Sequence, residues 1–101
     1  MSTHKDLDVW KLGIDLVEKV YQLTSEFPSN EKFGLSSQIQ RSAVSVPSNV
    51  AEGAARNSNK DYVRFLYISL GSLSELETQI IIAERIKYLK SLEILEDIKL
   101  I

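Results

Sequence analysis

The stretch that decides the fold of this chain is IQRSAVSVPSNVAEGAARN, residues 39–57. Apolar side chains recur in it every three or four residues, as the core-facing stripe of an amphipathic helix requires: Ile39, Ala43, Val46, Val50 and Ala54. The opposite side carries five polar residues, which we call the polar seam: Arg41, Ser45, Ser48, Asn49 and Glu52. The pattern predicts one helix over residues 35–54, which ends near Gly53.

Pro47 lies in the middle of this predicted helix. A proline there removes the hydrogen bond to the carbonyl of Ala43 and costs about 3 kcal/mol in a helix interior. Small residues surround Pro47, among them Ser42 and Ser48. We therefore expect a kinked helix that lies close to its neighbours, with serine hydroxyls bonding carbonyls near the kink.

Helical periodicity continues over nearly the whole chain of 101 residues, which forms a single domain over residues 1–101. A first helix is predicted over about 8–25, and Phe27-Pro28 follows its end. A third is predicted over about 59–87, where Ser58 and Asp61 form a capping-box variant, and a short fourth over about 91–101. The fold class is therefore all-α.

The helices have more apolar surface than one small core needs. The first helix carries two apolar stripes, one of which is Trp10, Ile14, Val17 and Tyr21, and the other Val9, Leu12, Leu16, Val20 and Leu23. The small residues in 69–74 would let another helix approach the third helix closely. The fourth helix would reach only about 16 Å, against about 40 Å for the third. We therefore expect homo-oligomers, in which other copies cover the apolar surface that remains.

Composition excludes several classes of protein. The chain has no cysteine, which excludes disulfides, thiolate metal sites and cysteine nucleophiles. A formal net charge of −2 argues against a strongly basic nucleic-acid binder that works as a monomer. No signal peptide and no apolar run of membrane-spanning length is visible, so we expect a soluble, cytoplasmic protein without membrane contact.

Two longer stretches resemble a known family. GLSSQIQRSAVSVPSNVAEGAARNSNKDYVRFLYISLGSLSELETQI, residues 34–80, resembles the core of the 23S ribosomal-RNA intervening-sequence proteins, and DVWKLGIDLVEKVY, residues 8–21, fits their first helix. The most specific motifs are SVPSNVAEG and LGSLSELET. The resemblance, over about residues 6–90, implies a bacterial protein that forms an antiparallel up-and-down four-helix bundle and a homopentameric ring.

The same family is distantly similar to the accessory variability protein of diversity-generating retroelements. That protein is a strongly basic pentameric barrel that binds nucleic acid and a reverse transcriptase. In the intervening-sequence family the fourth helix normally continues beyond the position of Ile101. The family has no established biochemical activity, so the resemblance implies a shape more than a function.

The polar seam has two interpretations. Arg41 and Glu52 are eleven residues apart, close to three helical turns, so they share a face, which Glu75 and Glu77 of the third helix could meet. The seam could line a pocket or channel. It could instead be a hydrogen-bonded network that fixes helix register, or provide an ion pair between subunits, and we favour this structural role because buried charges need partners.

A second candidate is the basic collar, which we define as Arg56, Lys60 and Arg64. These residues recur every fourth position near one end of the predicted bundle. Repeated around a ring, they would form a positive surface able to meet phosphates of RNA or DNA. The alternative is a solvated face paired with Asp61.

Other chemistries find little support. The single histidine is His4, and the Glu-x-x-His motif of di-iron bundles is absent from the sequence, so we expect no metal and no cofactor. No histidine is placed to activate a serine, and we identify no small-molecule substrate. Five aromatic residues could stack on bases, but their helical spacing favours core or interface packing: Trp10, Tyr21, Tyr62, Phe65 and Tyr67.

The functional hypothesis is therefore a non-enzymatic, homo-oligomeric interaction scaffold that binds nucleic acid or a nucleoprotein partner through the basic collar. The alternative is a protein-only adaptor with no nucleic-acid binding. The acidic net charge favours the adaptor, whereas the basic collar and the family resemblance favour nucleic acid.

Overall fold

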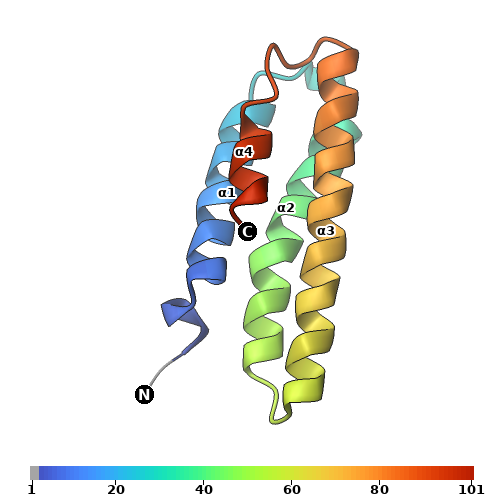
Figure 1. Cartoon of the computed structure of the whole chain (residues 1–101). Helices are drawn as coiled ribbons and strands as arrows, with labels where there is room; N and C mark the ends of the chain where they lie inside the picture. The colour runs from blue at the N-terminus through green and yellow to red at the C-terminus, as the bar shows by residue number, and fades with distance from the viewer. Residues whose placement is uncertain (1–2) are drawn as a thin grey trace.

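A computed structural model describes residues 3–101, and its regular elements are all helical. The α-helices are α1 (Asp8–Thr24), α2 (Leu35–Ala54), α3 (Asn59–Arg85) and α4 (Ile94–Lys99), with short 3-10 helices η1 (His4–Asp6) and η2 (Ser29–Glu31). Figure 1 shows α1, α2 and α3 running up, down and up the long axis, with α4 beside the upper part of α1. The all-α fold with four helices is thus confirmed.

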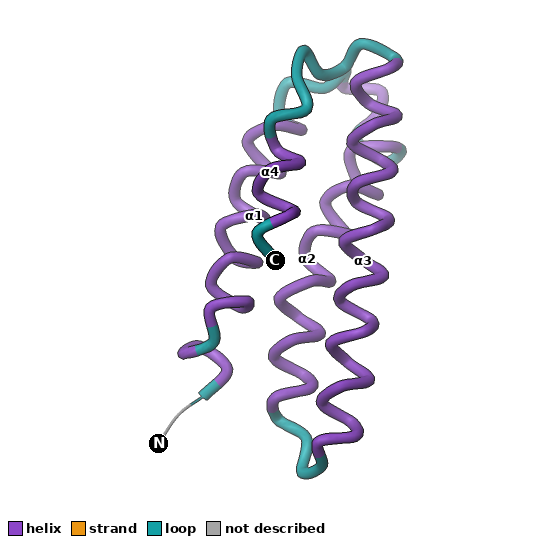
Figure 2. The backbone as a smooth tube through the Cα atoms, in the orientation of Figure 1, coloured by secondary structure: helices purple, strands orange, loops and turns teal. Residues whose placement is uncertain are grey.

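The rod-shaped molecule measures 44 × 19 × 19 Å. Figure 2 shows that the α2–α3 turn lies at the lower end, while the α1–α2 and α3–α4 connections lie together at the upper end. The core runs along the centre between these ends and consists mainly of aliphatic side chains: Leu16, Val20, Ile39, Ala43, Val46, Leu73, Leu76, Ile80, Ala83, Ile94 and Ile98, with Phe27 near the upper end.

Helix α2 packs against both α1 and α3, and small residues make this possible. Pro47 is buried inside the helix and faces Gly13 of α1, where an added Cβ would lie 3.1 Å from the proline Cβ. On the other side, the hydroxyl of Ser69 in α3 donates to the carbonyl of Val46, 2.9 Å away. The small residues in 69–74 therefore admit α2, with Ser45 and Ser72 also 2.8 Å apart.

The end of α3 differs from the prediction, because the helix stops at Arg85 rather than Lys87. Lys87 has a positive φ of 69°, and the N–H groups of Lys87 and Tyr88 donate back to the carbonyls of Glu84 and Ala83. This is a Schellman motif, which normally has glycine at the left-handed position. A lysine there gives no sequence signal for a helix end.

Helix α4 also differs, because it begins at Ile94 rather than Ser91 and ends at Lys99 rather than at residue 101. The hydroxyl of Ser91 accepts a hydrogen bond from the N–H of Glu93, so this residue forms a local turn before the helix. After Lys99, the N–H of Ile101 bonds to the carbonyl of Ile98, three residues back, which is the tighter 3-10 pattern.

Two side-chain hydrogen bonds hold the C-terminal segment to the rest of the molecule. Lys19 of α1 donates to Asp97 of α4 at 2.7 Å, and this bond raises the pKa of Lys19 above its usual range. The hydroxyl of Tyr88 donates to Glu31 at 2.9 Å, which raises the pKa of Tyr88 above its usual range. Each hydrogen bond favours the protonated form of its donor, Lys19 or Tyr88. Both donors are therefore protonated at neutral pH and hold α4 and the loop before it against the bundle.

Within residues 3–101, the helices are too short or too polar to cross a membrane.

Glycine substitutions test how closely the helices approach each other. A Cβ added at Gly53 would lie 2.7 Å from the Cβ of Phe65, so we expect Gly53→Ala to lower the free energy of unfolding by about 1–3 kcal/mol. Gly71 is the matched control, because a Cβ there meets nothing within 4 Å. We expect Gly71→Ala to raise the free energy of unfolding by up to about 1 kcal/mol, because alanine favours a helix more than glycine does. Urea denaturation at one chain concentration measures both, and equal stabilities would contradict the packing described.

Candidate functional site

The basic collar lies at the lower end of the bundle, around the α2–α3 turn. Arg56 lies two residues after the end of α2, and Lys60 and Arg64 belong to the first two turns of α3. The turn ends at Ser58, whose hydroxyl accepts from the N–H of Asp61 at 3.1 Å and caps α3, as half of the predicted capping box. The cap fixes where α3 begins and hence where its two basic side chains emerge.

A buried aromatic ring organises the two arginines of the collar. The guanidinium carbons of Arg56 and Arg64 lie 4.9 and 5.0 Å from the centre of the Phe65 ring. Such cation–π contacts hold a guanidinium in place while leaving its N–H groups free to donate. Phe65 is therefore a packing residue, as predicted, and it also supports the collar.

The charges of the collar are only partly compensated. Arg56 forms an ion pair with Glu52, 3.1 Å apart. Lys60 and Arg64 form no ion pair with another residue in 3–101, and Asp61, the partner expected in the solvated-face interpretation, pairs with none of them. All three collar side chains are solvent-exposed. The collar therefore keeps two uncompensated positive charges.

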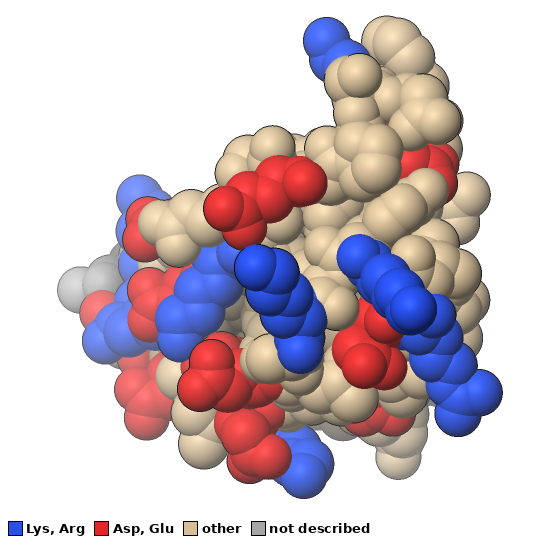
Figure 3. All heavy atoms as spheres, turned by 90° about the horizontal axis from the view of Figure 1, so that it is seen from above, with Lys and Arg blue, Asp and Glu red and all other residues tan. Residues whose placement is uncertain are grey.

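A shallow pocket of about 260 Å³ adjoins the collar. It lies between η1 and the α2–α3 turn, and its polar lining residues are Thr3, His4, Arg56, Asn57, Ser58, Asn59 and Tyr62. Figure 3 shows the opposite, upper end of the molecule, where Lys and Arg side chains are interspersed with Asp and Glu. Acidic residues also lie near the collar, at Glu52 and Asp61.

The polar seam lies where α2 meets α3, but its centre is a residue outside the predicted set. Ser42 is buried, and its hydroxyl lies 2.8 Å from Glu75 and 3.0 Å from Gln79. The amide nitrogen of Gln79 in turn donates to Glu75 at 3.3 Å. Of the predicted residues, Asn49 donates to both the carbonyl and the hydroxyl of Ser45. The seam is thus a hydrogen-bonded network between two helices.

The charged members of the seam do not pair with each other. Arg41 is exposed, lines an open depression of about 430 Å³ with Glu75, and forms no ion pair within residues 3–101. Glu52 pairs with Arg56 of the collar instead. Ser48 is exposed, and Glu77 makes no hydrogen bond to the seam in the part of the chain that the structure describes. The side chains form two hydrogen-bonded groups, Ser42 with Glu75 and Gln79, and Ser45 with Asn49 and Ser72. Arg41 has no ion-pair partner within residues 3–101.

Sequence reasoning missed three members of this network, namely Ser42, Ser72 and Gln79. Their spacing was a usable signal, because Ser42 precedes Ser45 by three residues and Gln79 follows Glu75 by four. Both pairs therefore occupy neighbouring positions on a helix surface. Because serine side chains are small, the sequence alone indicated only a packing role for Ser42 and Ser72.

Among residues 3–101, His, Asp and Glu side chains form no group of three or more that could hold a metal ion. His4 packs edge-on against Trp10, with ring centres 5.3 Å apart. The five aromatic residues considered for base stacking differ in solvent exposure. Phe65 is buried, Trp10 and Tyr62 are partly buried, and Tyr21 and Tyr67 are exposed.

Comparison with known proteins agrees with the motifs in α2 and α3. The family model described as 23S rRNA-intervening sequence protein matches residues 5–100 of the chain. The match confirms the resemblance that SVPSNVAEG and LGSLSELET indicate. No curated protein matches the chain.

The hydrogen-bonded network predicts different outcomes for two serines of α2. We expect Ser42→Ala to lower the free energy of unfolding by about 1 kcal/mol, because it removes a buried donor and leaves Glu75 and Gln79 with fewer partners. Ser48→Ala removes an exposed hydroxyl and should change the free energy of unfolding by less than about 0.5 kcal/mol. Thermal or urea unfolding of both variants measures the difference. If Ser42→Ala is as stable as Ser48→Ala, the network does not stabilise the fold.

Proposed function

The chain belongs to the 23S rRNA-intervening sequence protein family, and we propose that it is a non-enzymatic, homo-oligomeric scaffold that binds nucleic acid or a nucleoprotein partner through its basic collar. The observation that carries this proposal is the pair of arginines held over Phe65, with Lys60 beside them. The proposed assembly is a pentamer and the proposed compartment the bacterial cytoplasm.

Exposed apolar side chains support self-association. Large hydrophobic residues are solvent-exposed on every long helix, including Ile14 and Tyr21 on α1, Val44 on α2, and Ile68 and Ile82 on α3. Ile14 and Tyr21 are the exposed members of one apolar stripe of α1, in which Val17 packs against the core. Large apolar patches on a small protein mark interaction surfaces. Arg41, exposed and unpaired within residues 3–101, is suited to an ion pair across such an interface.

The collar supports a nucleic-acid partner because of its geometry as well as its charge. Guanidinium groups recognise phosphate through two parallel N–H donors, and stacking on Phe65 restricts their orientation. Lys60 adds a flexible third charge. In a ring, copies of the collar would lie at one end, so that weak phosphate contacts act together.

The ion pair between Arg56 and Glu52 favours the alternative, a protein-only adaptor. It neutralises one of three collar charges, and the chain as a whole has a net charge of −2. An adaptor would use the same apolar surfaces without needing phosphate contacts. The two functions differ in their dependence on salt, which distinguishes them experimentally.

Nucleic-acid binding through the collar predicts a local effect of charge removal. We expect the double variant Lys60→Gln, Arg64→Gln to bind single-stranded RNA less tightly, with a salt dependence (log Kd against log salt) shallower by about 2. The control is Lys87→Gln, Lys90→Gln, which removes the same charge near the opposite end and should bind like the wild type. Fluorescence anisotropy at several salt concentrations measures both. No binding by the wild type at low salt, or equal loss in both variants, would contradict the proposal.

Self-association predicts a native mass that is a multiple of 11.4 kDa, five-fold for the pentamer. Because Arg41 has no partner within residues 3–101, we expect Arg41→Ala to leave the fold intact and to shift the assembly towards smaller species on dilution. Lys90→Ala is the control for the loss of one exposed positive charge. Native mass spectrometry and circular dichroism measure mass and fold. A monomeric wild type would refute the assembly, and an unchanged Arg41→Ala assembly would refute the ion pair.

A further inference from the structure

The pocket of about 260 Å³ beside the basic collar has a lining that the proposed function does not use. Leu7, Gly53 and Ala54 supply its apolar part. Around them lie hydroxyl, carboxamide, imidazole and guanidinium groups of η1, the α2–α3 turn and the first turn of α3. Among residues 3–101, no Asp or Glu side chain lines it. The pocket therefore combines apolar surface, donors and acceptors without a carboxylate that would repel an anionic polymer.

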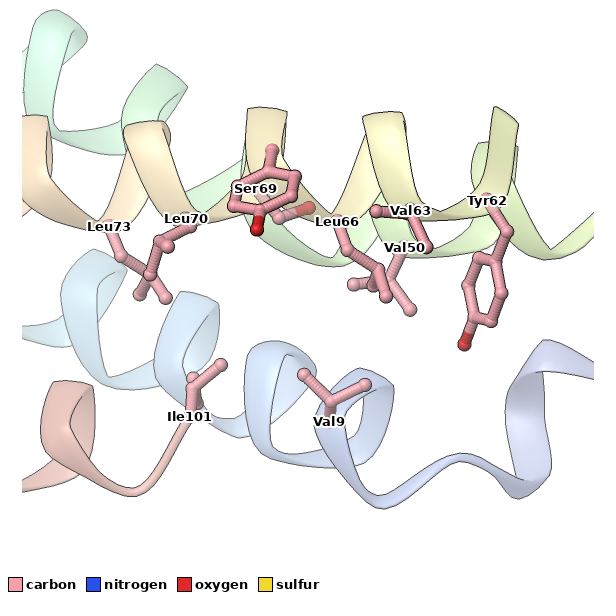
Figure 4. Close-up of a pocket in the computed structure, with 10 residues that line it drawn as sticks. Val9, Val50, Tyr62, Val63, Leu66, Ser69, Leu70, Leu73 and Ile101 are labelled. Carbon is pink, nitrogen blue, oxygen red and sulfur yellow. The ribbon is translucent and has the colours of Figure 1, made fainter. Parts of the chain in front are cut away.

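An aromatic ring, that of Tyr62, lines this pocket. Tyr62 also borders the neighbouring apolar pocket between α1 and α3, and Figure 4 shows it at the end of the row of α3 side chains, with its ring projecting towards the start of α1. The ring packs over Gly53, where an added Cβ would lie 3.1 Å from a ring carbon. Tyr62 is only partly buried, and its hydroxyl forms no hydrogen bond with another residue in 3–101. Part of the ring thus contacts the bundle, and the rest is open to a ligand.

Two carboxamides of the α2–α3 turn face no protein partner. Asn57 and Asn59 are exposed, line the pocket and make no side-chain hydrogen bond to another residue in 3–101. Each carboxamide has a donor and an acceptor side by side, which matches the paired donor and acceptor on the edge of a nucleobase. Ser58 between them caps α3 through the N–H of Asp61, so the turn has a fixed shape. The turn therefore presents the kind of group that recognises bases.

The pocket and the rest of the collar differ in charge. Arg56 lines the pocket, and Glu52, 3.1 Å away, compensates its charge. Lys60 and Arg64 do not line the pocket and form no ion pair within residues 3–101. A polar pocket with a compensated charge suits an uncharged base, whereas the two uncompensated charges suit phosphate.

Charged residues of both signs surround the pocket without lining it: Lys5, Asp6, Asp8, Glu52, Lys60, Asp61 and Arg64. The carboxylate of Asp6 accepts the N–H of Thr3 and closes the η1 capping box. Because these charges are mixed, they favour neither an anion nor a cation inside the pocket. Its shape and its hydrogen-bonding groups therefore select the ligand.

Arg56 joins the pocket to the rest of the collar. It lines the pocket, and its guanidinium carbon lies 4.9 Å from the centre of the Phe65 ring. The guanidinium carbon of Arg64 lies 5.0 Å from the centre of the same ring. The pocket and the uncompensated charge of Arg64 are therefore close enough to contact one short stretch of a polymer.

We infer that this pocket binds one unpaired nucleobase of a single-stranded nucleic acid whose phosphates contact Lys60 and Arg64. The inference rests on the proposed function of the collar and names its substrate as single-stranded. A base can enter only where its edge and its face are free, as in loops, ends and single strands. The pocket is smaller than the roughly 300–1,000 Å³ of sites for drug-sized ligands, so it holds one base rather than a stack. Stacking on Tyr62 and hydrogen bonds to Asn57 and Asn59 hold the base.

A matched pair of strands tests the inference with the whole chain. The probe is a fluorescein-labelled RNA strand of about eight adenylates, within the usual site size of single-strand binders. The matched strand has the same length and charge but lacks the bases. We expect the RNA to bind at least about tenfold more tightly than the abasic strand in a titration followed by fluorescence anisotropy, because only the RNA can stack a base on Tyr62.

Variants of the protein locate the base. Tyr62→Leu should weaken binding of the RNA about tenfold and leave binding of the abasic strand and of duplex RNA unchanged, because neither presents a free base. Tyr67→Leu is the control, since Tyr67 is 69% exposed on the same helix and does not line this pocket. Asn57→Ala should weaken binding of the RNA about two- to tenfold through the loss of a hydrogen bond. Circular dichroism verifies that each variant remains helical.

Three results would overturn the inference: equal binding of the RNA and the abasic strand by the wild type, RNA binding that Tyr62→Leu leaves unchanged, or adenosine monophosphate that binds as tightly as the RNA, which would make a free nucleotide the ligand. If Tyr62→Leu loses its helicity, unchanged RNA binding by Asn57→Ala decides against the inference in its place. The proposed function fails in a different way, through a wild type that binds neither strand at low salt. Equal binding of both strands refutes the base pocket and leaves phosphate binding by the collar standing.

Discussion

The close approach of α2 to two neighbours at once is the constraint on which the rest of the structure depends. At its midpoint Pro47 packs against Gly13 on one side, and the carbonyl of Val46 accepts a hydrogen bond from Ser69 on the other. A proline inside a helix is costly because it removes a backbone hydrogen bond. Here the ring is buried against a residue without a side chain, so its apolar surface contributes to the core and offsets part of that cost.

With α2 in the central position, α1 and α3 lie on opposite sides of it, and only a fourth helix can cover the face between them. The six residues of α4 cover the upper part of that face and leave the lower part open. On α1, Ile14 and Tyr21 are exposed, whereas Val17 between them packs against the core. The exposed part of α1 thus follows from the central position of α2.

Sequence reasoning succeeded where periodicity and local signals agree and failed where tertiary contacts decide. The bounds of α2 and the start of α3 followed from an apolar stripe and from Ser58. The end of α3 did not, because Lys87 occupies a left-handed position that usually requires glycine. In the polar seam, Arg41 was the most conspicuous residue, yet the buried Ser42 makes the contacts, since only the packing of α3 on α2 brings Glu75 and Gln79 near it.

The net charge of −2 does not describe the surroundings of each charged residue, because acidic and basic side chains alternate along the helices. Lys11 lies between Asp8 and Asp15 on α1, and Glu52 and Asp61 lie near the collar at the α2–α3 turn. Within the collar, two guanidinium groups lie 4.9 and 5.0 Å from the centre of the same ring. Glu52 compensates one of them, at Arg56. The second, Arg64, forms no ion pair within residues 3–101, so its guanidinium stays accessible to solvent and to anions.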